Sequence, residues 1–139
     1  MVTIAPPRIV GRLRAKHAGA SEGDLFDAGC PTRLILDRIG DKWTVLVVLL
    51  LSDGPMRFSQ LRADLGRVAP KVLTQTLRRM ERDGLITREV FAEVPPRVDY
   101  ALTELGRSLA RPIAVIGDWA EVHIGQIASA QAAYDAKQR

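Results

Sequence analysis

The chain has 139 residues, of which 47% are hydrophobic and 26% charged, a composition typical of one globular domain rather than of a disordered protein. Twenty Lys and Arg against sixteen Asp and Glu give a formal net charge of +4, which favours a polyanionic partner without proving one. The longest apolar run, residues 45–51, is far shorter than the ~20 residues that cross a bilayer, and no signal-like stretch opens the chain, so we expect a cytoplasmic protein without membrane contact.

The N-terminal segment, residues 1–24, is predicted to be a flexible basic arm. It contains several proline and glycine residues and no acidic residue before Glu22. Its basic side chains are Arg8, Arg12, Arg14, Lys16 and His17. Such an arm can lie in a DNA groove, lie along a partner subunit, or be an ordinary loose terminus. The folded domain is expected over residues 25–128, followed by a polar C-terminal tail over residues 129–139.

Two helices are predicted next. Pro31 suits the first turn of a short helix that Gly40 ends, and Asp41 can cap a second helix that runs to Leu51. Taken alone, the Val-rich run 45–51 also fits a buried strand. The capping residue before it and the turn-forming residues after it favour a helix.

A helix-turn-helix is predicted in the middle of the chain. A short strand at residues 56–57 leads into a third helix over residues 58–65, which Gly66 ends. Pro70 fits the first turn of a fourth helix, and it pushes Ala69 toward an extended conformation. Two short helices separated by a brief turn are typical of this motif.

The fourth helix, residues 70–83, has two faces at about 100° per residue. The face predicted to be buried comprises Val72, Leu73, Thr76, Leu77 and Met80. The outer face comprises Lys71, Thr74, Gln75, Arg78 and Arg82. Arg and Lys neutralise phosphate and bind guanine, Gln pairs with adenine, and Thr contacts base edges or thymine methyl groups. An ordinary solvated helix has the same pattern, so the neighbouring elements must decide.

A β-hairpin is predicted directly after this helix. Residues 85–91 and 98–102 alternate in the way that half-buried strands do, and a proline-rich loop joins them. A hairpin in this place is the wing of a winged helix. We expect Arg97, at the wing tip, to reach phosphate or the minor groove.

A long last helix is predicted to begin after Thr103, which can cap it. Its apolar stripe comprises Leu105, Leu109, Ile113, Ile116, Trp119, His123 and Ile127. The stripe exceeds what one small domain needs, so we interpret it as a homodimer surface; packing over the chain's own first two helices is the alternative. Pro112 is expected to kink this helix.

Seven segments of the chain together resemble the HxlR family of bacterial transcriptional regulators. They lie in the family's order and spacing over roughly residues 30–120. The segments are Cys30-Pro31, Ile39-Gly40-Asp41-Lys42-Trp43-Thr44, Gly54-Pro55-Met56-Arg57-Phe58-Ser59-Gln60-Leu61-Arg62, Pro70-Lys71-Val72-Leu73-Thr74-Gln75-Thr76-Leu77, Asp83-Gly84-Leu85-Ile86, Val94-Pro95-Pro96-Arg97-Val98-Asp99-Tyr100 and Leu102-Thr103-Glu104-Leu105-Gly106.

The resemblance implies an α+β, mostly α fold: a winged helix-turn-helix of MarR-like type with additional N- and C-terminal dimerisation helices. It also implies a homodimer that binds a double-stranded DNA operator with inverted half-sites, most simply as a repressor. We assign Lys71, Thr74, Gln75 and Arg78 to base edges. The DNA backbone is assigned to Arg79, Arg82, Arg88 and Arg97, with Ser59 and Pro70 also at the interface. The chain departs from its relatives at Ala69, a poor N-cap where they often carry serine.

Cys30, the single cysteine, excludes an internal disulfide but not one between two chains. It precedes the first helix, whose dipole favours a thiolate, and cysteines here in several family members resemble sensors of oxidants or electrophiles. Those relatives often hold a second cysteine, which this chain lacks. A sensor and an inert packing residue are therefore both open readings of Cys30.

No enzyme is predicted, because the chain has no convergent set of reactive groups. His17 and His123 are isolated, and one cysteine with two scattered histidines makes no metal site. We expect no cofactor. Two alternatives to a redox-responsive regulator remain: a winged-helix adaptor that binds protein, and a regulator with a small-ligand pocket at the dimer interface, which Trp43 and Trp119 could line.

Overall fold

The computed structural model describes residues 31–139. Contacts divide the chain into two units, residues 1–42 and residues 43–139. The predicted basic arm, residues 1–24, and Cys30 lie outside the described residues. The first described element is α2 (Pro31–Ile39), and it begins and ends where the sequence predicts.

Helix α2 has no buried residue. Its end is marked by Gly40, whose N–H donates to the Leu36 carbonyl over 2.9 Å. Leu34, Ile35 and Leu36 are each about half exposed. An apolar surface of this kind on a nine-residue helix is typical of an element that packs against a further surface.

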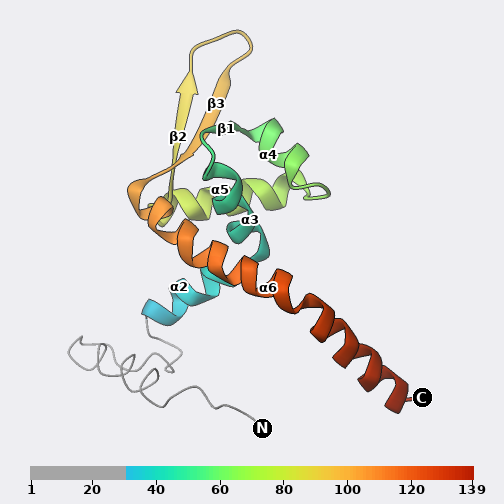
Figure 1. Cartoon of the computed structure of the whole chain (residues 1–139). Helices are drawn as coiled ribbons and strands as arrows, with labels where there is room; N and C mark the ends of the chain where they lie inside the picture. Colours follow the sequence, from blue (N-terminus) through green and yellow to red (C-terminus); the bar gives the residue numbers. More distant parts are fainter. Residues whose placement is uncertain (1–30) are drawn as a thin grey trace, which may run out of the picture. The chain divides into compact units, whose positions relative to one another are not determined.

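The second unit is a winged helix-turn-helix (Figure 1). In chain order its elements are α3 (Lys42–Leu51, which begins at the unit boundary), β1 (Met56–Arg57), α4 (Phe58–Asp64), α5 (Pro70–Arg82), β2 (Ile86–Phe91), β3 (Arg97–Leu102) and α6 (Glu104–Lys137). The ambiguous run 45–51 is helical, as the flanking cap and turn predicted. The fold class expected from the sequence is therefore confirmed.

The three strands form one antiparallel sheet in the order β1-β3-β2. The hairpin register pairs Ile86 with Leu102 at its base and Phe91 with Arg97 at its tip. Strand β1 pairs with the outer edge of β3, so that Arg57 lies opposite Asp99. The short β1 thus ties the start of α4 to the wing.

The hydrophobic core joins α3, α4, α5, the base of the wing and the first part of α6. Its buried members are Val47, Val48, Leu51, Leu61, Val68, Leu73, Leu77, Met80, Ile86, Leu102 and Ile113. Trp43 packs against this cluster, which supports its reading as a core residue rather than as the wall of an effector pocket. The core holds the outer face of α5 and the wing in fixed positions.

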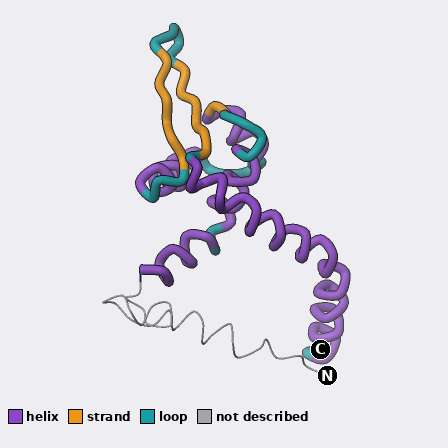
Figure 2. The backbone as a smooth tube through the Cα atoms, turned by 60° about the vertical axis from the view of Figure 1, so that its left-hand side comes forward, coloured by secondary structure: helices purple, strands orange, loops and turns teal. Residues whose placement is uncertain are grey.

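Helix α6 is longer than predicted. It continues through Pro112 and through most of the segment that we expected to be a separate polar tail, ending at Lys137. In Figures 1 and 2 its C-terminal half extends away from α3, α4 and α5. Only Gly106 and Ile113 are buried within α6. One helix therefore serves two purposes: its first turns close the core, and the rest presents its surface outward.

The end of α5 and the start of α6 meet at one junction. Gly84, at a φ of +77°, ends α5, and the Leu85 N–H donates to the Met80 carbonyl over 2.9 Å, which is a Schellman ending. The Thr103 N–H in turn donates to the Leu85 carbonyl over 3.0 Å. The Thr103 hydroxyl accepts from the Gly106 N–H over 3.0 Å and so caps α6, as the sequence predicted.

Candidate nucleic-acid interface

The recognition helix α5 starts at Pro70 as predicted, although its N-cap residue is Ala69. Ala69 has an extended backbone and makes no side-chain cap, so the proline at the first helical position supplies the start signal. Leu73, Thr76, Leu77 and Met80 are buried. The sequence was wrong about Val72, which is 37% exposed, because it lies at the edge of the buried face and not within it.

The outer face of α5 presents side chains that can bind DNA. Exposed residues on it are Pro70, Lys71, Gln75, Arg78, Arg79 and Arg82, with Thr74 half-buried. Ser59 is exposed in the first turn of α4. The residues of α4 and α5 that the sequence assigned to DNA are thus exposed or half-buried, and DNA can reach them.

The wing places Arg88 and Arg97, both predicted to contact the DNA backbone, on opposite faces of its sheet. Side chains alternate between the two faces of a strand, and Arg88 pairs in register with Tyr100 whereas Phe91 pairs with Arg97. Arg88 and Tyr100 therefore share one face, and Arg97 lies on the other. Arg88 is on the face toward α5.

A small pocket marks the contact between α5 and this face of the wing. It has a volume of about 190 Å³. Its lining residues are Thr74, Leu77, Arg78 and Glu81 from α5 with Arg88 and Tyr100 from the wing. Arg78 of α5 and Arg88 of the wing thus lie on one surface, where both can face the same stretch of a polyanion.

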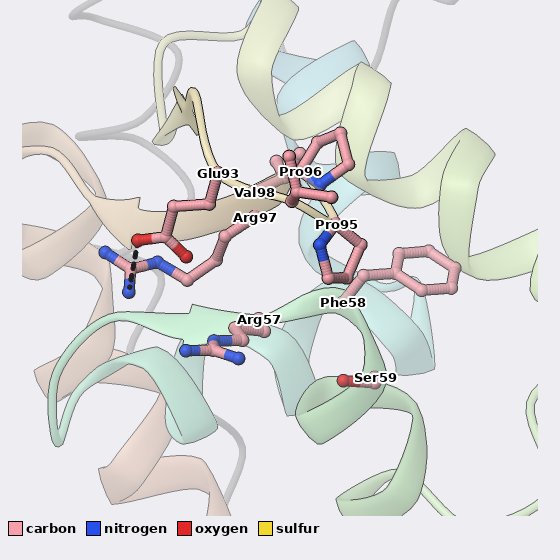
Figure 3. Close-up of a pocket in the computed structure, with 9 residues that line it drawn as sticks. Arg57, Phe58, Ser59, Glu93, Pro95, Pro96, Arg97 and Val98 are labelled. Carbon is pink, nitrogen blue, oxygen red and sulfur yellow. Dashed lines mark ion pairs between the residues drawn. The ribbon is translucent and has the colours of Figure 1, made fainter.

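Arg97 is held within the wing rather than extended from it (Figure 3). Its Nη1 lies 3.3 Å from a Glu93 carboxylate oxygen, and its Nε lies 3.4 Å from Asp99 Oδ1 in an ion pair whose geometry makes no hydrogen bond. The guanidinium carbon also lies 4.1 Å from the centre of the Phe91 ring, a cation–π distance. The Arg97 side chain is only 27% exposed. Contact of Arg97 with phosphate or the minor groove stays a prediction, and these contacts show that DNA would have to compete with Glu93 and Asp99 for the guanidinium.

Beside Arg97, the wing tip and the start of α4 enclose a second pocket of about 400 Å³. Its residues are Arg57, Phe58, Ser59, Glu93, Val94, Pro95, Pro96, Arg97 and Val98. In Figure 3, the Arg57 side chain extends on the same side as the Arg97 guanidinium. Sequence reasoning assigned no role to Glu93, Asp99 or Arg57. The hairpin register, which places Phe91 opposite Arg97, was the one signal that could have revealed this cluster.

The predicted dimer stripe on α6 divides into two parts. Ile113 is 2% exposed and is buried in the chain's own core, so it is not part of a dimer surface. Leu109 is half-buried and packs against the same core, which includes residues of α3, the second predicted helix. The alternative of packing over the chain's own helices is therefore supported for α3. The exposed members are Leu105, Ile116, Trp119 and Ile127.

His123 lies half-buried against Trp119. The two rings stack with centroids 4.6 Å apart, and His123 Nδ1 lies 2.7 Å from the Trp119 carbonyl oxygen. These contacts give His123 a structural role on the exposed half of α6.

Within residues 31–139, no group of His, Cys, Asp and Glu side chains could hold a metal ion. No helix in that range is long and apolar enough to span a membrane.

Comparisons with known proteins agree with this architecture. The family described as HxlR-like helix-turn-helix matches residues 38–128. The uncharacterised HTH-type transcriptional regulator YtfH of Escherichia coli (strain K12) is 39% identical over 106 residues, covering 76% of this chain and 84% of YtfH.

Two solved structures extend the likeness to the fold. A candidate transcriptional regulator, ytfH from Salmonella typhimurium, is 39% identical with a TM-score of 0.74, covering 80% of this chain and 99% of that one. The redox regulator HypR in its reduced form is 36% identical with a TM-score of 0.67, covering 72% and 99%. The matched region contains α3, the helix-turn-helix, the wing and most of α6. The chain is therefore a transcriptional regulator that belongs to the HxlR-like helix-turn-helix family.

Proposed function

We propose that this protein is a homodimeric repressor that binds an inverted-repeat operator through α5. The observation that carries the proposal is the division of α5 into a buried apolar face and an exposed face of Lys, Gln and Arg. Over residues 70–83, four basic and two acidic residues give a net charge of +2. A positive outer face favours DNA over a protein partner.

The proposed division of labour follows from position on α5 and the wing. Lys71, Thr74, Gln75 and Arg78 lie on the first and middle turns of the helix, which reach base edges in helix-turn-helix proteins. Arg79, Arg82 and Arg88 are proposed to contact phosphates. Two such helices in a dimer need a separation of about 34 Å to enter successive major grooves on one side of the DNA.

The second chain is proposed to dock along the exposed half of α6. Ile116 and Trp119 are 60% and 57% exposed there, although both are large and apolar. Tyr134 and Ile127 border a further shallow pocket of about 510 Å³ nearer the C-terminus. Large exposed apolar side chains on one helix mark an interaction surface, and a second copy would cover them by two-fold symmetry.

The test is selection of DNA from a random pool by the purified protein, followed by affinity measurements with variants. Arg78→Ala should relax the base preference at one operator position by about 1–3 kcal/mol. Arg111→Ala, an exposed arginine on α6, is the matched control and should leave that preference unchanged. The proposal fails if the protein enriches no sequence, or if Arg78→Ala binds and discriminates like the wild type.

A response to oxidants through Cys30 is the second part of the proposal. It is supported by the likeness to HypR, which has been solved as a redox regulator in reduced and oxidised forms, at 36% and 39% identity to this chain. In a dimer, two Cys30 thiols would lose two electrons and two protons to an oxidant such as diamide and join in one disulfide. Cys30→Ser should then abolish release of the operator by diamide. Unchanged release in that variant would eliminate this part alone.

A further inference from the structure

We propose that Glu93 sets the affinity of the wing for DNA by competing with phosphate for Arg97. The inference rests on the proposed DNA-binding function and adds a residue to which sequence analysis gave no role. The two groups face each other across the loop of the wing: Glu93 follows β2, and Arg97 opens β3. Their ion pair of 3.3 Å is the contact drawn in Figure 3.

The charges around Arg97 explain why it is a poor phosphate ligand as it stands. One guanidinium faces two carboxylates, those of Glu93 and Asp99. With Arg57, which lies opposite Asp99 in the sheet register, the cluster of four side chains carries no net charge. An anion that approaches this cluster therefore gains little electrostatic attraction until one carboxylate moves away or is removed.

The two carboxylates hold Arg97 in different ways. Asp99 lies on β3 with a side chain only 25% exposed, and Arg57 lies opposite it in the sheet register. Glu93 lies in the loop with a side chain 51% exposed. Because the Glu93 side chain is solvated and carried by a loop, it is the partner that can leave Arg97 at lower cost. Asp99 and the Phe91 ring then keep the guanidinium oriented.

The space beside the ion pair allows such an exchange. The pocket of about 400 Å³ between the wing tip and the start of α4 is lined by Arg57, Glu93 and Arg97, together with the exposed Ser59. A phosphate that replaced the Glu93 carboxylate there would meet two cations, Arg57 and Arg97, with one remaining carboxylate, that of Asp99, instead of two. Glu93 thereby lowers affinity in the free protein by occupying the place that DNA needs.

The experiment compares variants by fluorescence anisotropy on a duplex of about 30 base pairs selected by the wild-type protein, across a range of salt concentrations. Glu93→Ala should tighten binding by about threefold to tenfold at low salt. The slope of log K against log salt should steepen by about 0.9 for each wing that gains a phosphate contact. Glu93→Gln, which loses the charge but keeps a hydrogen-bond acceptor, should show a smaller gain of the same sign.

The matched control is Glu89→Ala. Glu89 is exposed on the same face of the wing, opposite Asp99, and the described ion pairs of Arg97 are with Glu93 and Asp99. General loss of negative charge would tighten both variants equally, whereas competition for Arg97 tightens only the Glu93 variant. In the double variant Glu93→Ala with Arg97→Ala, the gain should disappear.

Each outcome decides between the two proposals. A wild-type protein that selects no DNA overturns the proposed function and this inference together. A wild-type protein that binds, with equal gains in the Glu93 and Glu89 variants or a gain that survives Arg97→Ala, overturns only the role of Glu93. If Glu93→Ala unfolds at a lower temperature than the wild type, Glu93→Gln supplies the same comparison, and absence of any gain in it also refutes the competition.

Discussion

The Thr103 hydroxyl donates to the Gly84 carbonyl over 2.6 Å, and so it joins the residue that follows the C-cap of α5 to the N-cap of α6. The same hydroxyl lies 3.2 Å from the Leu85 carbonyl and accepts from the Gly106 N–H. One side chain thus satisfies backbone groups on both sides of the junction. Any movement of α6 relative to α5 must strain or break these bonds.

Thr103→Ala should lower the free energy of unfolding by about 1–2 kcal/mol, because it removes both the helix cap and the donor to Gly84. Urea unfolding followed by circular dichroism measures the change. Thr103→Ser keeps the hydroxyl and is the control, with a much smaller loss expected. Equal losses in the two variants would show that the hydroxyl is not the stabilising group.

Gly106→Ala should destabilise the protein by about 1–3 kcal/mol, since the added Cβ would overlap the Leu85 carbonyl oxygen and press on the Leu102 side chain at 2.9 Å. Gly125→Ala, in the same helix, meets nothing within 4 Å and should stabilise by about 0.5–1 kcal/mol. Thermal unfolding of the two variants under identical conditions gives the comparison. A neutral Gly106→Ala would mean that α6 can shift away from Leu85 at little cost.

Thr76→Val should raise the free energy of unfolding by about 1 kcal/mol. Thr76 is fully buried on the inner face of the recognition helix α5, and its hydroxyl oxygen has no hydrogen-bond partner. Valine has nearly the same shape and removes the unsatisfied polar group. Thr76→Ala, which leaves a void instead, should lower stability. A loss of stability in Thr76→Val would show that the hydroxyl is satisfied in solution.

Ile116→Asp should weaken association of the chains by about a hundredfold or more, because it would bury an unpaired carboxylate at the proposed dimer surface on α6. Sedimentation velocity across a concentration series measures the effect. Ala114→Asp is the matched control: Ala114 is exposed, lies two residues before Ile116 on nearly the opposite side of the same helix, and should not change association when substituted. If both variants remain dimeric, or the wild type is a monomer, the α6 surface is not the interface.

Much of the fold could be predicted from the sequence because its signals are local. Pro31, Pro70 and Thr103 mark helix starts through the chemistry of the first turn, and Gly84 marks a helix end through its left-handed backbone. Alternating residues marked the strands. These features depend on neighbours within a few positions, so the order and approximate bounds of the elements follow from the chain alone.

The sequence was less informative where a surface is shared between elements. The apolar stripe of α6 has one period along its whole length, yet Ile113 closes the core while Ile116, three residues later, is 60% exposed. Periodicity identifies a face but does not identify what covers it. Soon after Ile113, α6 no longer packs against the core. Where along the helix this packing stops is set by the tertiary structure only.

In the candidate DNA-binding site, too, some features follow from local sequence and others only from the tertiary structure. The sequence by itself determined the outer face of α5, because burial of Leu73, Leu77 and Met80 forces Lys71, Gln75 and Arg78 outward. Only the tertiary structure decided the contacts of Arg97, because two of its partners, Glu93 and Phe91, lie on the other side of a hairpin. Sheet register and loop geometry, rather than residue type, bring Glu93, Asp99 and Phe91 around that guanidinium. A basic residue is a charge in the sequence, but the carboxylates that fold against it determine how much of that charge remains for DNA.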